Sequence, residues 1–288
     1  MTKKLVTRLE KHFGKPPEMP DRSVLDTLVF AVCLENDGYA AADRAYAALG
    51  EQFHDLNEIR VSSISELASA FAHQADPELR AHRIRSILQY VFEDQFEFDL
   101  EAVRKKTQEQ AAKKIGKIRG LSPFVRNFVQ QSSLGAHLVP LDDRMTAAVV
   151  WLGLVDSGTS TEAAADALKS AVRKADSVIL CHLLRCLAAE PPGRNLFDPA
   201  SFSVPQGGYT ASDAMRRVEE LLSGKSRGSA AEKTSKTLKA AKKPAKEVAA
   251  AKRPAAKRPA AKKPKAAESA SKSTAAAKKA KGRSRAAS

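Results

Sequence analysis

The segment AKKIGKIRGLSPFVR, residues 112–126, carries the pattern that decides the fold. It predicts a helix, a tight turn at Arg119-Gly120-Leu121-Ser122, and a second helix that begins with Ser122 and Pro123. Such a turn points the backbone N–H groups at the start of the second helix outward, where they and the helix dipole suit a phosphate. A turn between two helices is often a simple connection, and that alternative stays open at this stage.

The sequence on both sides of this segment predicts helices and no strand. Apolar residues recur with a period of about 3.6 through residues 1–224. Residues 24–34, VLDTLVFAVCL, are apolar on almost every face and predict a buried central helix, which Asn36-Asp37-Gly38 ends. Asp76 and Pro77 predict an N-cap and the first position of a helix that runs to about Val91. Further helices are predicted over residues 39–53, 63 or 65 to 72, 99–106, 107–118, 122–135, 142 or 143 to 154, 161–175, 176–189 and 212–222.

An acidic pair follows the hairpin at the start of another apolar helix. Asp142 stands 22 residues after Gly120, and Asp143 follows it directly. Either carboxylate can cap the helix that contains TAAVVWLGL, which is worth about 1 kcal/mol. Trp151 lies in this apolar run and is expected in the core, and Tyr39 and Tyr46 are likewise expected to pack inside.

Together the hairpin and the acidic segment resemble the DNA glycosylases of the helix-hairpin-helix (HhH-GPD) superfamily, in particular the endonuclease III group. Residues 118–122, IRGLS, match the family's Leu-Pro-Gly-Val-Gly hairpin, and residues 141–144, LDDR, match its Val-Asp-Thr-His-like segment. The resemblance extends more weakly over residues 22–190. It implies an all-α, two-lobed fold, a DNA partner, and a catalytic role for Asp142, although a plain helix cap remains the alternative for this residue.

The departures from the family pattern narrow the implied chemistry. Ser122 replaces the second hairpin glycine, Arg119 replaces the proline, and Phe124 stands where bifunctional members have their Schiff-base lysine. No glutamine stands at residues 35–37, where the family has its DNA wedge. The resemblance therefore implies a monofunctional N-glycosylase that flips out a base and uses Asp142 to stabilise the oxocarbenium-like sugar. The alternative is a catalytically inactive architectural protein that only grips DNA.

No cofactor or metal is expected. The chain has three cysteines, so the four-cysteine iron–sulfur cluster of many relatives is missing, and its histidines show no metal-ligand spacing. Cys33, Cys181 and Cys186 lie in apolar helical text and are expected to be reduced core residues of an intracellular protein. Candidate DNA contacts at the hairpin are Lys117, Arg119, Gly120, Leu121, Ser122 and Arg126, although three cations on one surface are more often a solvated face.

Residues 225–288 differ in composition from everything before them. They contain 21 Lys and Arg against three acids, a net charge of +18, which leaves −3 for residues 1–224. Without aromatic residues and with almost no large apolar side chains, this segment is predicted to be a disordered tail. Its AKRPA repeats resemble the tails of linker histones and of some bacterial nucleoid proteins. The predicted phosphate contacts of the tail are Lys252, Arg253, Lys257, Arg258, Lys262 and Lys263.

The sequence thus predicts a helical glycosylase-like core at residues 1–224 and a DNA-binding tail at residues 225–288. A solubilising or membrane-attracted polybasic linker is the alternative for the tail, but neither a lipidation motif nor an amphipathic apolar face accompanies the charge. Double-stranded DNA is the expected partner, with RNA open as a second partner of the tail. We expect a monomer without a membrane partner, located in the cytoplasm on the nucleoid, or in the nucleus if the source is eukaryotic.

Overall fold

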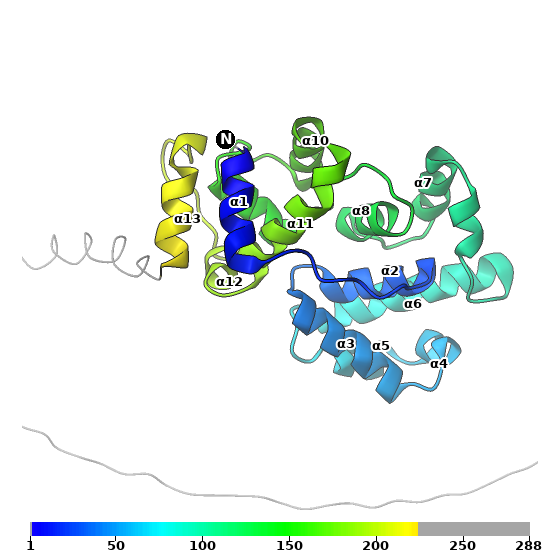
Figure 1. Cartoon of the computed structure of the whole chain (residues 1–288). Coiled ribbons are helices and arrows are strands. Elements are labelled where there is room, and N and C mark those ends of the chain that lie inside the picture. The colour runs from blue at the N-terminus through cyan, green and yellow to red at the C-terminus, as the bar shows by residue number, and fades with distance from the viewer. Residues whose placement is uncertain (1, 224–288) are drawn as a thin grey trace, which may run out of the picture. The chain divides into compact units, whose positions relative to one another are not determined.

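The computed structural model describes residues 2–223, in which every regular element is a helix. The predicted all-α class is therefore confirmed for the described part of the chain. The helices form two lobes, each around its own cluster of buried apolar side chains (Figure 1). The predicted boundary between core and tail, and the tail itself, fall outside the described residues.

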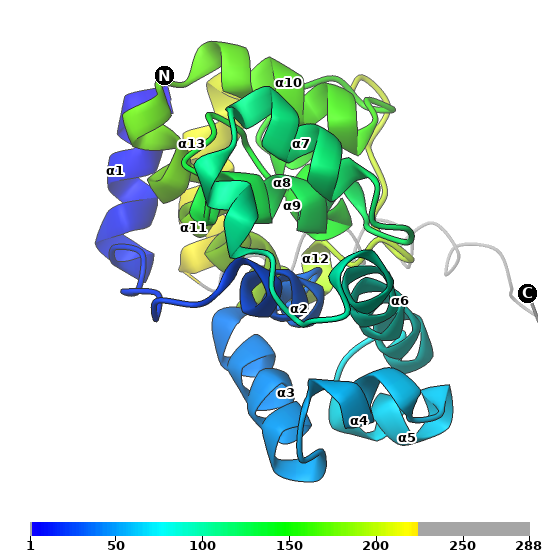
Figure 2. The same ribbon diagram turned by 90° about the vertical axis from the view of Figure 1, so that its right-hand side faces the viewer.

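The first lobe is built around α2 (Val24–Leu34), which is almost entirely buried, as its apolar sequence predicted. Ser23 caps this helix by accepting a hydrogen bond from the N–H of Asp26. Helix α2 contacts α3, α6 and α8, and it lies with α6 between α3–α5 and the rest of the molecule (Figure 2). The other elements of this lobe are α3 (Tyr39–Gln52), α4 (Leu56–Val61), α5 (Ile64–Ala68), η1 (Ser69–Phe71), α6 (Pro77–Gln95), η2 (Glu101–Lys105), α7 (Gln108–Gly116) and α8 (Pro123–Ser132).

The second lobe is built around α9 (Asp143–Trp151) and α11 (Lys174–Ala189), which pack against each other. Trp151 is buried there with its ring edge-on to Phe197, so its predicted core position is confirmed. The N-terminal helix packs on α11, so the two ends of the described chain meet in this lobe (Figure 1). The remaining elements are α1 (Thr2–Phe13), α10 (Thr161–Ala171), α12 (Gly193–Leu196), η3 (Ala211–Asp213) and α13 (Ala214–Leu222).

Local structure differs from the sequence prediction in a few places. Helix α6 begins at Pro77 as predicted, but Asp76 does not cap it, because Asp76 has φ of 52° instead of the extended backbone that lets a side chain reach the helix N–H groups. The helix predicted over residues 99–106 is a 3₁₀ helix, and α4, capped by Asp55, was not predicted. None of the helices among the described residues is both long and apolar enough to cross a membrane.

Candidate functional site

The predicted hairpin is present between α7 and α8. Gly120 has φ of 80°, the left-handed conformation that only glycine adopts at little cost. A Cβ atom at this position would meet the Cβ of Ser86 on α6 at 3.8 Å, an ordinary contact, so the backbone angle and not lack of space requires glycine. Ser122 then caps α8 by accepting a hydrogen bond from the N–H of Val125 at 3.1 Å.

The cations predicted around the hairpin do not share one surface. Lys117 and Arg119 are exposed on the turn and border a groove beside α6. Arg126 lies on α8 and pairs with Glu162 of α10 at 3.3 Å, away from that groove. The turn residue Leu121 is half-buried, and the predicted tail contacts lie outside the described residues. The structure therefore brings together two of the three predicted hairpin cations.

Asp142 joins the two lobes at the N-terminus of α9. Its Oδ1 accepts a hydrogen bond from the N–H of Met145 at 2.9 Å, which is the predicted helix cap. Its Oδ2 accepts a hydrogen bond from the N–H of Asn36, just after α2, at 3.0 Å. The same oxygen lies 3.1 Å from Nη2 of Arg185, and the Asp142 side chain is 1% exposed. Both carboxylate oxygens are therefore engaged by protein groups inside the molecule.

Arg185, on α11, is a site residue that the sequence did not predict. Its Nη1 donates hydrogen bonds to the carbonyl oxygens of Leu34 and Asp37, both at 2.8 Å. Its guanidinium also lies over the ring of Phe124, 4.7 Å from the centroid. The side chain is only 3% exposed. The sequence signal for this residue is a single arginine within the mostly apolar segment VILCHLLRCLAA. A buried charge needs a partner, so such an arginine indicates a buried carboxylate nearby.

Two further buried carboxylates lie in the loop after α2. Asp37 pairs with Arg80 of α6 at 3.0 Å and with Arg194 of α12 at 3.2 Å. Glu35 pairs with Arg83 of α6. Burial raises the pKa of both Glu35 and Asp37, and the neighbouring arginines oppose that shift. A network of paired charges thus lies at the interface between the lobes, and among its members Asp37, Asp142 and Arg185 are almost fully buried.

A small cavity lies beside this network. It has a volume of about 100 Å³ and is lined mainly by apolar side chains, among them Tyr39, Phe124, Phe128 and Met145, with Arg185 on its wall. Asp142 is not among the lining residues. Pockets that bury a drug-sized ligand usually measure about 300–1,000 Å³. In this conformation the cavity neither reaches Asp142 nor offers the space of an ordinary ligand site.

The cysteines do not fit the iron–sulfur cluster of the related glycosylases. Such a cluster needs four thiolates, whereas this chain has three cysteines in all. All three are buried, and burial raises the pKa of the Cys33 thiol to about 12. Within residues 2–223, His, Cys, Asp and Glu side chains form no group of three or more that could hold a metal ion.

Comparison with known proteins confirms the fold. No family model and no curated protein matches this chain. A solved structure of a non-covalent endonuclease III–DNA complex matches it with a TM-score of 0.54 and 15% identity, covering 75% of this chain and 97% of that protein. A trapped endonuclease III–DNA covalent intermediate gives a TM-score of 0.53, 16% identity and the same coverage.

An 8-oxoguanine glycosylase/lyase from Clostridium acetobutylicum, in complex with double-stranded DNA, also matches. Its TM-score is 0.51 and its identity 12%, over 65% of this chain and 66% of that protein. This protein therefore has the all-α, two-lobed fold of the helix-hairpin-helix DNA glycosylases. The fold that the sequence resemblance implied, with the hairpin between α7 and α8 and the acid at the start of α9, is the fold observed.

Proposed function

We propose that this protein binds double-stranded DNA through the hairpin side of a glycosylase-like core, and that Asp142 is a structural acid in it. The fold and the left-handed turn at Gly120 support the DNA-binding part, because such a turn directs the N-terminus of α8 toward a phosphate. One observation carries the structural role of the acid. Asp142 is buried, with both oxygens hydrogen-bonded and Arg185 paired against it.

The chemistry of base release explains why this pairing matters. A catalytic carboxylate stabilises the positive charge that develops on the sugar as the base departs. At Asp142 a positive charge is already present, because the guanidinium of Arg185 lies 3.1 Å from Oδ2. Separating such a buried pair leaves an uncompensated charge, which costs about 3–5 kcal/mol when one partner is removed by mutation. An enzyme using Asp142 would meet a cost of this kind each time a sugar replaced Arg185.

The covalent route lacks its nucleophile. Phe124 stands at the position of the family's Schiff-base lysine, and its phenyl ring is buried beneath the guanidinium of Arg185. A phenyl ring cannot attack the sugar C1′. The nearest lysines along the sequence, Lys113, Lys114 and Lys117, precede the turn, and Lys114 pairs with Asp94 of α6. We therefore expect no Schiff-base chemistry at this position.

A second candidate function is monofunctional N-glycosylase activity through Asp142. The position of Asp142 favours it, since this acid stands at the start of α9 after the hairpin, where the resemblance places the family's catalytic aspartate. Under this hypothesis Arg185 moves away when DNA binds. No covalent intermediate forms, and the product is an intact abasic strand that breaks only on added alkali.

A panel of lesion-containing duplexes tests both candidates on the full-length protein. Wild-type protein is expected to retard the duplexes in a gel without releasing a base, and borohydride is expected to trap no adduct. Asp143→Asn is the matched control for Asp142→Asn, because it removes a neighbouring carboxylate that is exposed. Alkali-dependent strand breaks that vanish in Asp142→Asn but persist in Asp143→Asn would establish the second candidate instead. Absence of duplex binding would refute the DNA-binding proposal.

A further inference from the structure

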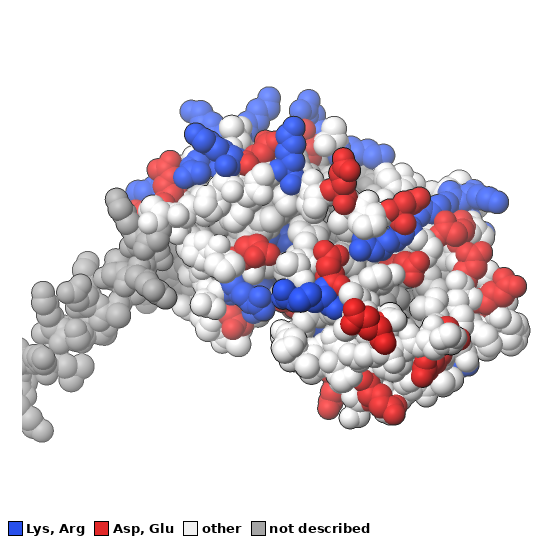
Figure 3. All heavy atoms as spheres, turned by 60° about the horizontal axis from the view of Figure 1, so that its bottom comes forward, with Lys and Arg blue, Asp and Glu red and all other residues white. Residues whose placement is uncertain are grey.

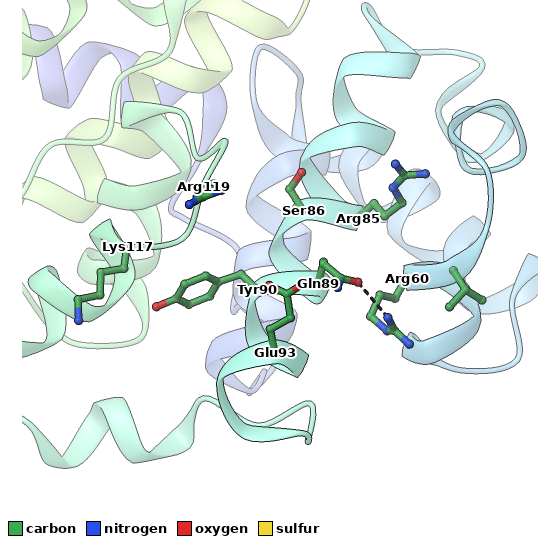
Figure 4. Close-up of a pocket in the computed structure, with 9 residues that line it drawn as sticks. Arg60, Arg85, Ser86, Gln89, Tyr90, Glu93, Lys117 and Arg119 are labelled. Carbon is green, nitrogen blue, oxygen red and sulfur yellow. Dashed lines mark hydrogen bonds between the residues drawn. The ribbon is translucent and has the colours of Figure 1, made fainter.

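A groove of about 830 Å³ lies beside the hairpin, between α4, α6 and the turn that follows α7 (Figure 4). It is separate from the buried network at Asp142. Arg119 and Lys117 come from the turn, Arg85 from α6 and Arg60 from α4 (Figure 4). The residues that line it are Arg60, Val61, Arg85, Ser86, Gln89, Tyr90, Glu93, Lys117 and Arg119.

The charges of this groove are unbalanced. Four lining residues are cationic, and Glu93 is the one acid among them. Glu93 accepts a hydrogen bond from Nε2 of Gln89 at 2.6 Å and pairs with no cation within the described chain. The side chains of Arg85, Lys117 and Arg119 form no ion pair or hydrogen bond with other residues of the 2–223 range. The groove therefore presents positive charge that pairs with no carboxylate of residues 2–223.

Most other arginines in the described part of the chain are paired with carboxylates. Residues 1–224 also carry a net charge of −3. On the face shown in Figure 3, acidic side chains predominate over the part of the first lobe formed by α3–α5. Lys3, Lys4, Arg8 and Lys11 on α1 form another cluster of cations in the described chain. Positive charge in this acidic domain is thus concentrated at a few places, and the groove is the one that lies beside the hairpin.

Arg60 is held in position by neutral partners. Its Nη2 donates to Oδ1 of Asn57 at 2.8 Å, and its Nη1 donates to Oε1 of Gln89 at 2.9 Å. Its guanidinium also lies over the ring of Phe92, 4.4 Å from the centroid. Amide oxygens and a ring orient the guanidinium without cancelling its charge. The side chain is thus fixed before any ligand arrives, which lowers the entropic cost of binding an anion.

The groove is continuous with the hairpin. The turn approaches α6 closely at Gly120 and Ser86, and Ser86 lines the groove. A polyanion that contacts the N-terminus of α8 through the turn therefore meets Arg119 and Lys117 first and Arg85 and Arg60 next. This order suits a phosphate backbone, which repeats its charge at regular intervals, better than it suits a single anion.

We propose that this groove binds the phosphate backbone of duplex DNA beside the segment held at the hairpin, with Arg60 and Arg85 as additional phosphate contacts. This inference rests on the proposed DNA binding of the core and extends its contact surface along α6 to α4. The ligand chemistry is phosphate, and its source is the DNA backbone. The competing hypothesis is that the groove binds a free phosphate ion, and the experiment must distinguish this from binding of the DNA backbone.

The test compares two double variants of the full-length protein that lose the same charge. Arg60→Gln/Arg85→Gln alters the groove, whereas Arg44→Gln/Arg216→Gln alters exposed arginines that do not line it. Affinity for a short duplex is measured by fluorescence anisotropy between about 50 and 200 mM salt. Log K falls with log salt, and each lost phosphate contact makes this negative slope shallower by about 0.9. The slope of the groove variant is expected to be shallower than that of wild type by about 1.8, and the slope of the control variant is expected to be about unchanged. Equal slopes in the two variants would overturn the proposal.

Two further measurements keep the outcome interpretable. Arg85→Gln alone is expected to show half of the change in slope expected for the double variant. This substitution removes no hydrogen bond formed within the described chain, so we expect the variant to fold. Arginine-specific modification is then read by mass spectrometry with duplex and with inorganic phosphate. Protection of Arg60 and Arg85 by duplex alone supports the proposal, whereas equal protection by phosphate indicates a free-anion site. Binding weakened by a hairpin variant but not by the groove variants would refute the groove and leave the proposed function standing.

Discussion

Asp142, the N-cap residue of α9, and Arg185 of α11 form a buried ion pair with 3.1 Å between Oδ2 and Nη2. Their other hydrogen bonds reach the end of α2. The pair therefore fastens the second lobe to the first. Because Arg185 also lies over Phe124, it connects the acid at the start of α9 with the first turn of α8. Asp142, to which the resemblance assigns a catalytic role, thus takes part here in an interaction between the two lobes.

Removing Arg185 should destabilise the fold strongly. In Arg185→Met the buried carboxylate of Asp142 loses its counter-charge, and the free energy of unfolding should fall by about 3–5 kcal/mol. Asp142→Asn should also destabilise, whereas the double variant should lose less than the sum of the two. The measurement is urea unfolding of the full-length variants followed by circular dichroism.

The exposed pair Arg173–Asp176 provides the control for this cycle. Its atoms are 2.8 Å apart, but the side chains are 78% and 48% exposed. Arg173→Met should change the free energy of unfolding by no more than about 1 kcal/mol, because solvent screens the pair. Additive effects of the Asp142 and Arg185 substitutions would show that the two side chains do not stabilise each other.

Glu35 should give the stability a pH dependence of known sign. Burial raises its pKa in the folded protein above the ordinary value of 4.5. The folded state therefore holds this proton more tightly than the unfolded state, and the stabilisation is present below pH 4.5 and lost as the pH rises through the folded pKa. Glu35→Gln cannot ionise, so its unfolding free energy relative to wild type should increase from about pH 4 upward.

Glu66 is the control with the opposite sign. Hydrogen bonds from the side chain and the backbone N–H of Ser63 lower its pKa in the folded protein. Its stabilisation is present above pH 4.5 and lost as the pH falls through the lowered pKa, so Glu66→Gln should become relatively less stable as the pH rises. The same pH trend in both variants would contradict the assigned causes.

Much of the fold was predictable because it depends on local signals. The apolar text of α2, the cap at Ser122 and the glycine at residue 120 act through neighbours in the sequence, so the helices and the hairpin follow from them. Helix α4 of the first lobe was harder to predict, because it has only six residues and its one clear sequence signal is the cap residue Asp55. Asp76 was wrongly predicted to cap α6, because its backbone conformation depends on the tertiary structure around it.

The buried ion network was not predictable from the sequence. Arg185 follows Asp142 by 43 residues and Asn36 precedes it by 106, so no local spacing pairs them. The same holds for Asp37, which meets Arg80 and Arg194 only after α6 and α12 have packed. Arg60 and Arg85 were overlooked for the same reason, since their groove exists only when the turn packs on α6. Sequence pattern identified the acid at the start of α9, whereas its partner required the tertiary structure.

Gly120→Val should weaken duplex binding by disturbing the turn that presents the start of α8. A non-glycine residue held at φ of 80° pays about 1–2 kcal/mol of strain, which the turn relieves by changing conformation. Gly158→Val is the matched control, because Gly158 has φ of 84° and open space around it, and it stands in the loop between α9 and α10. Both variants should lose similar stability, but only Gly120→Val should lose affinity in an anisotropy titration. Equal affinity in the two variants would make the hairpin a simple connection.

Deleting residues 225–288 should remove most of the non-specific DNA affinity while leaving the helical signal of the core. The deleted segment carries a net charge of +18, and the remaining chain carries −3. Because each phosphate contact contributes about 0.9 to the slope of log K against log salt, the truncated protein should show a much shallower salt dependence. The residual slope should come from the hairpin and the groove, so Arg60→Gln/Arg85→Gln should lower it further. Circular dichroism checks the fold, and anisotropy at about 150 mM salt measures the affinity. If the truncated protein binds duplex as tightly as the full chain, the tail is not the main phosphate-binding segment.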